Sequence, residues 1–239
     1  MKNKKDIILA VILVLGLGFG IGTTILIANS PAPKVSELVD GKINVFAVQS
    51  DGKKIIGGDF AKRHIVRADS AGLVDESFGA GNTVGFFNAP VHTLKILAND
   101  SILVGGAFTN YDQQIVGGFI KLSADGQVDL EFASKLGTGF DDKVMKIELT
   151  KDGKILVAGA FRKFNGKDAH GLVRLNADGS VDESFNIGEG FDKTVQALFV
   201  SEKNEFHVGG NFTMFNGKPK NYYLKLDASG NLIWRADLV

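Results

Sequence analysis

The chain of 239 residues contains no cysteine, which excludes disulfides, thiolate nucleophiles and cysteine-ligated metals. It also lacks a surplus of either charge: Lys plus Arg and Asp plus Glu both number 27, so the formal net charge is zero. Without a basic surplus, there is no global field to hold the phosphate backbone of a nucleic acid. We therefore expect no nucleic-acid partner, and neither absence by itself names a compartment.

Catalytic and metal-binding signatures are missing as well. There is no Gly-x-Ser-x-Gly elbow and no phosphate-binding loop. The four histidines lie at non-equivalent places, and none has a His or carboxylate partner at ligand spacing: His64, His92, His170 and His207. Adjacent acids such as Asp182 and Glu183 point to opposite faces of a strand. We predict no catalytic residue, no metal site and no cofactor, and hence not an enzyme; the ligand-binding residues stay unknown.

What the sequence does contain is one apolar, glycine-rich motif in four copies, which we call the glycine motif. The copies end at Phe60, Phe108, Phe161 and Phe212, which lie 48, 53 and 51 residues apart. A repeat of about fifty residues is typical of propeller blades rather than of helical solenoids. The glycine motif is apolar at almost every position, as expected of a strand that is covered on both faces.

Each repeat also has a strand-like segment of alternating apolar and polar residues before the glycine motif, and two further strand-like segments after it. Turn signals such as Asp152-Gly153 separate these segments. No helical periodicity is evident after residue 30. The predicted fold class is all-β: a β-propeller domain (43–239) of four blade-like repeats of about 50 residues. We name the repeats units one to four, with bounds of about 43–90, 91–143, 144–194 and 195–239. Unit one is shortened, and unit four departs from the pattern at Trp234.

Unit three carries a resemblance to a known family. Its Asp-Gly-Lys-Ile-Leu-Val (152–157), followed by Gly159-x-Phe161 and by Arg-Leu-Asn-Ala-Asp-Gly-Ser-Val-Asp (174–182), resembles the delta-60 repeat of bacterial β-propeller proteins. The likeness covers about residues 43–239 and is partial in units one and four. Proteins with this repeat are largely secreted or surface-attached and share no general catalytic motif. The resemblance therefore implies fold and exposure, and it transfers no active site.

The amino-terminal stretch predicts a membrane anchor or an export signal (1–30). Lys2, Lys4 and Lys5 precede an uncharged run at 7–28, which is long enough to span a bilayer as a helix. The lysines place the amino terminus in the cytoplasm and the repeats across the membrane. Two alternatives stay open: an uncleaved transmembrane helix, or a signal peptide cleaved near Ala28-Asn29-Ser30. A Pro-containing linker (31–42) follows.

Two groups of side chains in the repeats allow more than one interpretation. Oxygen-bearing residues alternate in unit three as in half of a calcium loop, with Asp125 and Asp129 partly repeating them in unit two: Asn176, Asp178, Ser180 and Asp182. Side-chain bonding within a turn explains them more simply. Tyr111, Phe164 and Phe215 stand at matching loop positions, where they either cap the core or form an aromatic rim for a glycan or a protein.

From these observations we expect a non-catalytic, membrane-anchored β-propeller in the periplasm or at the cell surface, acting as a protein-binding or assembly module. The alternatives are a structural subunit of a larger envelope complex or filament, and a secreted glycan-binding propeller. Four units can close alone, stay open until a partner completes them, or pair in two chains as eight blades. Uncovered apolar blade faces require closure or association.

Overall fold

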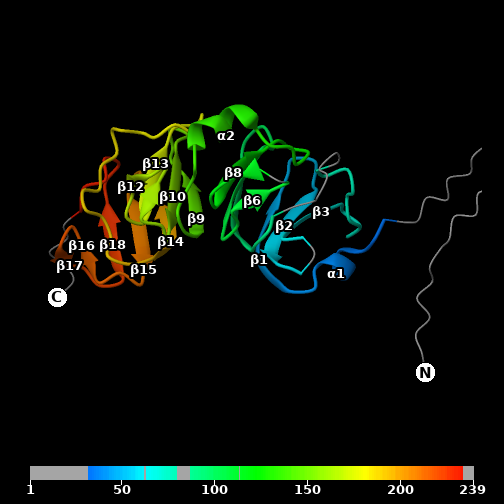
Figure 1. Cartoon of the computed structure of the whole chain (residues 1–239), viewed down its shortest axis with the longest axis horizontal. Helices are drawn as coiled ribbons and strands as arrows, with labels where there is room; N and C mark the ends of the chain where they lie inside the picture. Colours follow the sequence, from blue (N-terminus) through cyan, green and yellow to red (C-terminus); the bar gives the residue numbers. More distant parts are fainter. Residues whose placement is uncertain (1–31, 62, 80–86, 113, 234–239) are drawn as a thin grey trace, which may run out of the picture. The chain divides into compact units, whose positions relative to one another are not determined.

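The computed structural model describes residues 32–61, 63–79, 87–112 and 114–233 (Figure 1). Residues Ala32–Val239 form one compact unit. The predicted anchor or signal segment (1–30), its apolar run at 7–28 and Trp234 lie outside the described residues. Within the described ranges, no helix is both long and apolar enough to cross a membrane.

The described part of the chain contains two helices and eighteen strands, labelled in Figure 1 where there is room. The helices are α1 (Val35–Leu38) and α2 (Leu130–Leu136). The strands are β1 (Lys42–Val48), β2 (Lys54–Asp59), β3 (Ile65–Ala68), β4 (Val91–Ile96), β5 (Ile102–Gly106), β6 (Asn110–Tyr111), β7 (Gln114–Ile115), β8 (Phe119–Leu122), β9 (Val144–Leu149), β10 (Ile155–Gly159), β11 (Lys163–Phe164), β12 (Lys167–Asp168), β13 (Leu172–Leu175), β14 (Val195–Val200), β15 (Phe206–Gly210), β16 (Met214–Phe215), β17 (Lys218–Pro219) and β18 (Tyr223–Leu226).

Each unit is built around one antiparallel, three-stranded sheet whose strands follow the chain order. The sheets are β1-β2-β3, β4-β5-β8, β9-β10-β13 and β14-β15-β18. The fourth segment of each unit joins its sheet by a single bridge, as Leu175 does with Val181 in unit three, so the expected fourth strand is reduced to one pairing. Two-stranded ribbons are inserted before the third strand in units two, three and four: β6-β7, β11-β12 and β16-β17.

The glycine motif forms the middle strand of every three-stranded sheet, in agreement with its predicted place as the second strand of each repeat. A Cβ built on its last glycine would lie 2.1 Å from the Lys143 carbonyl oxygen at Gly159 and 2.2 Å from the Thr194 carbonyl oxygen at Gly210. The same clash recurs at Gly58 and Gly106. Glycine is required there because the backbone that leads into the first strand passes directly over it.

The structure contains two short helices that the repeat pattern did not predict, and the longer of them is α2. Asp129 caps α2 by accepting a hydrogen bond from Phe132 N at 3.0 Å. Phe132 and Leu136, four residues apart, are buried on one side of the helix. A capping acid followed by this apolar spacing is a recognisable helix signal, but a single seven-residue helix is too short to show a sustained period.

The predicted linker (31–42) contains the short helix α1 and is hydrogen-bonded to unit one. Val74 N donates to the Pro33 carbonyl oxygen at 2.8 Å, and Val35 N donates to the Gly72 carbonyl oxygen at 3.1 Å. These bonds place residues 33–35 along the edge of the fourth segment of unit one.

The core lies between successive sheets. Ile55 and Ile65 of unit one belong to the same apolar cluster as Val91 and Leu94 of unit two. Two further clusters join unit two to unit three and unit three to unit four in the same way. Accordingly β1 lies against β4, β4 against β9, and β9 against β14. The sheets of units two and three are therefore covered on both faces, one by the preceding unit and the other by the next.

Candidate functional site

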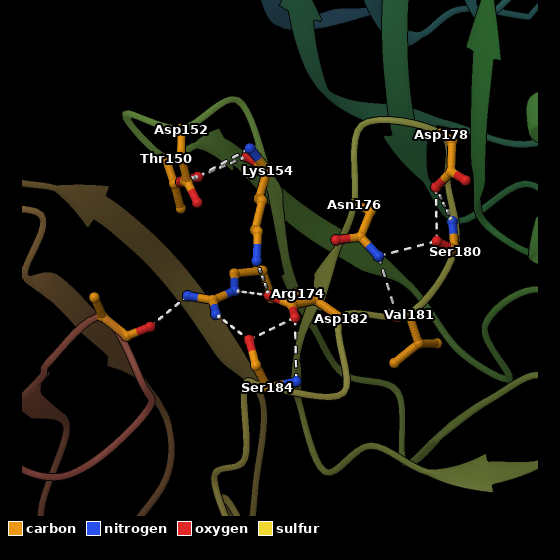
Figure 2. A network of polar contacts seen from close by, with 11 residues as sticks. Thr150, Asp152, Lys154, Arg174, Asn176, Asp178, Ser180, Val181, Asp182 and Ser184 are labelled. Carbon is orange, nitrogen blue, oxygen red and sulfur yellow. Dashed lines mark hydrogen bonds and ion pairs between the residues drawn. The ribbon is translucent and has the colours of Figure 1, made fainter.

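A cluster of charged side chains lies in unit three (Figure 2). Arg174 Nε and Lys154 Nζ both donate to Asp182 Oδ2, at 2.6 and 2.7 Å. Ser184 Oγ donates to the other carboxylate oxygen of Asp182 at 2.6 Å. Arg174 and Asp182 are buried, with 7% and 6% of their surface exposed. Buried carboxylates are also used in acid–base catalysis, so the bonding of Asp182 to these two cations decides its role.

The same cluster recurs in unit one, where Arg67 and Lys53 contact Asp75 at 3.0 Å. The arginine of each cluster also bridges to the following unit: Arg67 donates to the Ala124 carbonyl oxygen at 2.7 Å, and Arg174 donates to that of Ala228. Both oxygens of the carboxylate accept hydrogen bonds within the cluster. The arginine of the same cluster connects its unit to the following unit. The cluster is therefore structural.

The carboxyl pKa values support this assignment. Burial alone would raise the pKa of Asp75, but hydrogen bonds from Ser77 and Lys53 and the charge of Arg67 together lower it to about 2. The pKa of Asp182 is lowered further, against its burial, by hydrogen bonds from Lys154, Ser184 and Arg174. An acid that stays ionised at neutral pH cannot donate a proton to a substrate.

We predict an acid-dependent loss of stability from these groups. A depressed folded-state pKa stabilises the fold above the unfolded-state pKa, which is 3.8 for Asp75, and this contribution disappears as the pH falls through the folded value. The free energy of unfolding should fall between about pH 5 and about pH 2, with Asp75 alone contributing on the order of 2 kcal/mol. Denaturant unfolding at a series of pH values measures this, and Asp75→Asn should flatten the curve. An equally steep curve in the variant would contradict the assignment.

The suggested half calcium loop is a hydrogen-bonded turn. Ser180 N and Ser180 Oγ donate to Asp178 Oδ1 at 3.0 and 2.6 Å, and Asn176 donates to Ser180 Oγ at 3.0 Å. Asp182 belongs to the arginine cluster instead (Figure 2). Over the described ranges, no group of three or more His, Asp or Glu side chains is arranged to hold a metal ion.

The matching loop aromatics cap the core rather than form a rim. Tyr111, Phe164 and Phe215 are at most 4% exposed, and each packs on a partner ring: Phe87, Phe140 and Phe191 respectively. The histidines are separate from one another; His92 Nδ1, for example, lies 3.2 Å from the Val144 carbonyl oxygen. The interpretation of Tyr111, Phe164 and Phe215 as a ligand rim is therefore wrong.

An exposed apolar surface instead covers the outer side of the first sheet. Ile43, Phe46 and Val48 on β1 are 51%, 68% and 52% exposed. The pairing registers make Phe46 equivalent to Leu94, Ile147 and Leu198, which are at most 6% exposed. We call Ile43, Phe46 and Val48 the leading face, because the equivalent side chains in later units are covered by the unit before.

A second exposed surface lies on the opposite side of the last sheet. Phe199 of β14 is 60% exposed and Tyr223 of β18 is 49% exposed. His207 of β15 lies between them: its ring contacts Phe199, and its Nδ1 lies 2.8 Å from Tyr223 Oη. We call Phe199, His207 and Tyr223 the trailing face. The residues equivalent to His207 in the earlier units, Ile55, Leu103 and Leu156, are buried against the next unit.

Sequence reasoning expected uncovered faces to be apolar but did not identify these residues. Phe46 stands in the same alternation as Leu94, so the strand pattern does not distinguish them. The substitutions at the trailing face were a usable signal, since His207 and Tyr223 replace aliphatic or phenylalanine side chains at their repeat positions. Contiguous exposed apolar surface marks interaction sites.

Comparison with known proteins agrees with the sheet topology. Three stretches of the chain match one family model. The family is described as a domain of unknown function (DUF5122) beta-propeller, and the matched residues are 49–78, 97–132 and 150–185. With four consecutive antiparallel sheets, the fold is all-β and propeller-like. No curated protein sequence matches the chain significantly.

Several solved structures are detectably similar to this chain. Streptogramin B lyase is 16% identical with a TM-score of 0.48, and the match covers 82% of this chain and 56% of the lyase chain. PorZ, a surface component of the type-IX secretion system of Porphyromonas gingivalis, is 14% identical with a TM-score of 0.46, covering 82% and 27%. A protein of unknown function from Bacteroides caccae is 14% identical with a TM-score of 0.33, covering 81% and 80%. The matches span 56% of the lyase chain and 27% of the PorZ chain, so less than two thirds of either.

Proposed function

We propose that the repeats are four propeller blades of the delta-60 type that act as a non-catalytic protein-binding or assembly module. The apolar run at 7–28 and the lysines before it support a membrane anchor with the repeats displayed outside the cytoplasm. The single observation that carries the binding role is the pair of exposed apolar faces at the two ends of the repeat array.

Both faces carry exposed apolar side chains and occupy positions that are buried between sheets elsewhere in the chain. Each is a central sheet face with aromatic side chains, and its equivalents in the same chain are covered by another sheet. Covering Phe46 and its neighbours removes apolar area from water, which favours association by roughly 25 cal/mol per Å² before the costs of binding. Aromatic anchors of this kind dominate the energy of protein interfaces.

The test compares what remains bound to three full-length proteins extracted gently from native membranes: the unmodified chain and two variants. We expect Phe46→Glu to reduce a stoichiometric companion at least about tenfold, because it places a charge on the leading face. Ile115→Glu is the matched control: Ile115 is 77% exposed, but it lies on β7, away from both faces. Mass spectrometry of the intact assemblies identifies the companion, which can be another protein or a second copy of the chain.

Equal recovery of the companion with all three proteins would contradict a binding role for the leading face. Recovery of the unmodified chain alone, shortened to begin near residue 31, would favour the secreted, glycan-binding alternative. In that case glycan arrays with a Phe199→Ala variant would test the trailing face, which combines exposed rings with the Tyr223 hydroxyl.

A further inference from the structure

We propose that the partner of each exposed face is a second copy of this chain. The trailing face of one copy packs on the leading face of the other, and the reverse contact completes a closed pair of eight units. This inference rests on the proposed function, because it names the occupant of the same two surfaces. The contacts that already join successive units within one chain support it.

Every internal junction uses the same two faces. Leu103 and Phe119 of unit two share a core with Val144 and Ile147 of unit three. Leu156 and Leu172 of unit three share a core with Val195 and Leu198 of unit four. By the pairing registers, the covering residues of unit four are His207 and Tyr223, and the covered residues of unit one are Ile43 and Phe46. The two exposed faces are therefore the two halves of one further junction.

At two of the three internal junctions, the side chain at the bulge of the first strand lies within hydrogen-bonding distance of a carbonyl oxygen of the next unit; Met145 holds this position at the third junction. At the first junction, Asn44 Nδ2 donates to the Val91 carbonyl oxygen at 2.9 Å. At the second, His92 Nδ1 lies 3.2 Å from the Val144 carbonyl oxygen. Gln196 holds the equivalent bulge position in unit four and is exposed. Its side-chain amide is placed to donate to the Ile43 carbonyl oxygen of a second copy.

A glycine on the trailing side leaves room for the incoming side chain. A Cβ built on Gly57 or Gly105 would lie 2.6 or 2.5 Å from the Val91 or Val144 side chain of the next unit. A Cβ on Gly209, the equivalent in unit four, would meet only Ala197 Cβ and the Tyr222 carbonyl oxygen among the described atoms, both at 3.6 Å. Ile43 is the equivalent of these valines and is likewise β-branched. Gly209 thus leaves space in which the Ile43 side chain of a second copy can pack.

The number of units favours a pair over a longer assembly. Head-to-tail contacts between identical chains give either closed rings or open filaments. Propellers typically contain about four to eight blades. Two copies supply eight blade-like units, which is within that range, and three copies exceed it. Two identical junctions then cover all four exposed faces.

The test is site-directed cross-linking in the full-length chain, which has no native cysteine. The double variant Ile43→Cys with Gln196→Cys is treated with a short bis-maleimide in mild detergent. We expect most of the protein to become a covalent species of twice the chain mass. Lys151→Cys with Glu202→Cys is the positive control, because these exposed side chains are in contact between units three and four of one chain and should link internally without doubling the mass. Ile115→Cys with Gln196→Cys should give no linked pair, because Ile115 lies off both faces.

A second variant tests whether the space beside Gly209 is needed for pairing. Gly209→Val fills the space on the trailing face, where a side chain meets no described backbone more closely than 3.6 Å from its Cβ. We expect the cross-linked pair to decrease at least about tenfold, since inserted methyl groups obstruct a packed contact. The thermal unfolding of the dissociated protein should be nearly unchanged, which separates lost pairing from misfolding.

The outcomes distinguish this inference from the proposed function. A ladder of higher multiples would overturn the closed pair in favour of a filament. An internal link between positions 43 and 196 at single mass would overturn it by showing that one chain closes alone. No link, together with a different companion protein lost in Phe46→Glu, would overturn the second copy and keep the binding role. No link and no companion would overturn both.

Discussion

Replacing Asp182 by asparagine is expected to lower the free energy of unfolding by about 3 kcal/mol. Asp182 accepts from Arg174 Nε and Lys154 Nζ on one oxygen and from Ser184 on the other, and it is 6% exposed. The amide keeps the shape but removes the charge that compensates two cations. Because Arg174 is itself buried, its guanidinium cannot recover that loss from water. Denaturant unfolding monitored by circular dichroism measures the change.

The matched control is Asp168→Asn. Asp168 pairs with Lys163 at 3.5 Å, but both side chains are more than half exposed, so the pair contributes little. We expect its unfolding midpoint to match that of the unmodified chain. A similar loss in both variants would show that net charge, rather than the buried cluster, determines the effect. The removal of Asp182 should also loosen the junction between units three and four, because Arg174 holds the Ala228 carbonyl oxygen.

Replacing Gly210 by alanine is expected to cost about 3 kcal/mol of folding free energy. The added Cβ would lie 2.2 Å from the Thr194 carbonyl oxygen and 2.9 Å from Val195 Cα, which are backbone atoms and cannot rotate away. The strand β14 would have to separate from β15 where they pair at Val195 and Gly210. Thermal unfolding should show a lowered midpoint for this variant.

The neighbouring glycine supplies the control. Gly209→Ala places its Cβ at ordinary contact distance from Ala197 and Tyr222, so we expect a change of less than about 0.5 kcal/mol. Alanine is also compatible with a covered junction, since Ala158 occupies the equivalent position in unit three. Equal destabilisation at both glycines would mean that the cost is a general loss of glycine flexibility and not the close backbone approach.

The recurring glycine motif was sufficient to predict the four middle strands and the spacing of the repeats. Local signals also indicated the turns: Gly52 and Gly153 have positive φ angles of 84° and 78°, as the Asp-Gly pairs predicted. The helix α2 was missed because its cap and its two buried residues occupy a single stretch of one repeat. The arginine clusters were missed because Arg174 and Lys154 contact Asp182 from positions 8 and 28 residues away.

The repeat, the strand period and the lack of a recognisable catalytic motif can be predicted from the sequence, because each depends on residues close together in the chain. Which apolar side chains are covered depends on contacts between units, which the tertiary structure shows. Phe46 and Leu94 occupy the same place in the strand pattern, yet one is 68% exposed and the other 6%. The difference arises because a preceding sheet covers Leu94 and none among the described residues covers Phe46. Burial in a repeat array depends on the neighbouring unit, and the residue's own sequence neighbourhood does not contain that information.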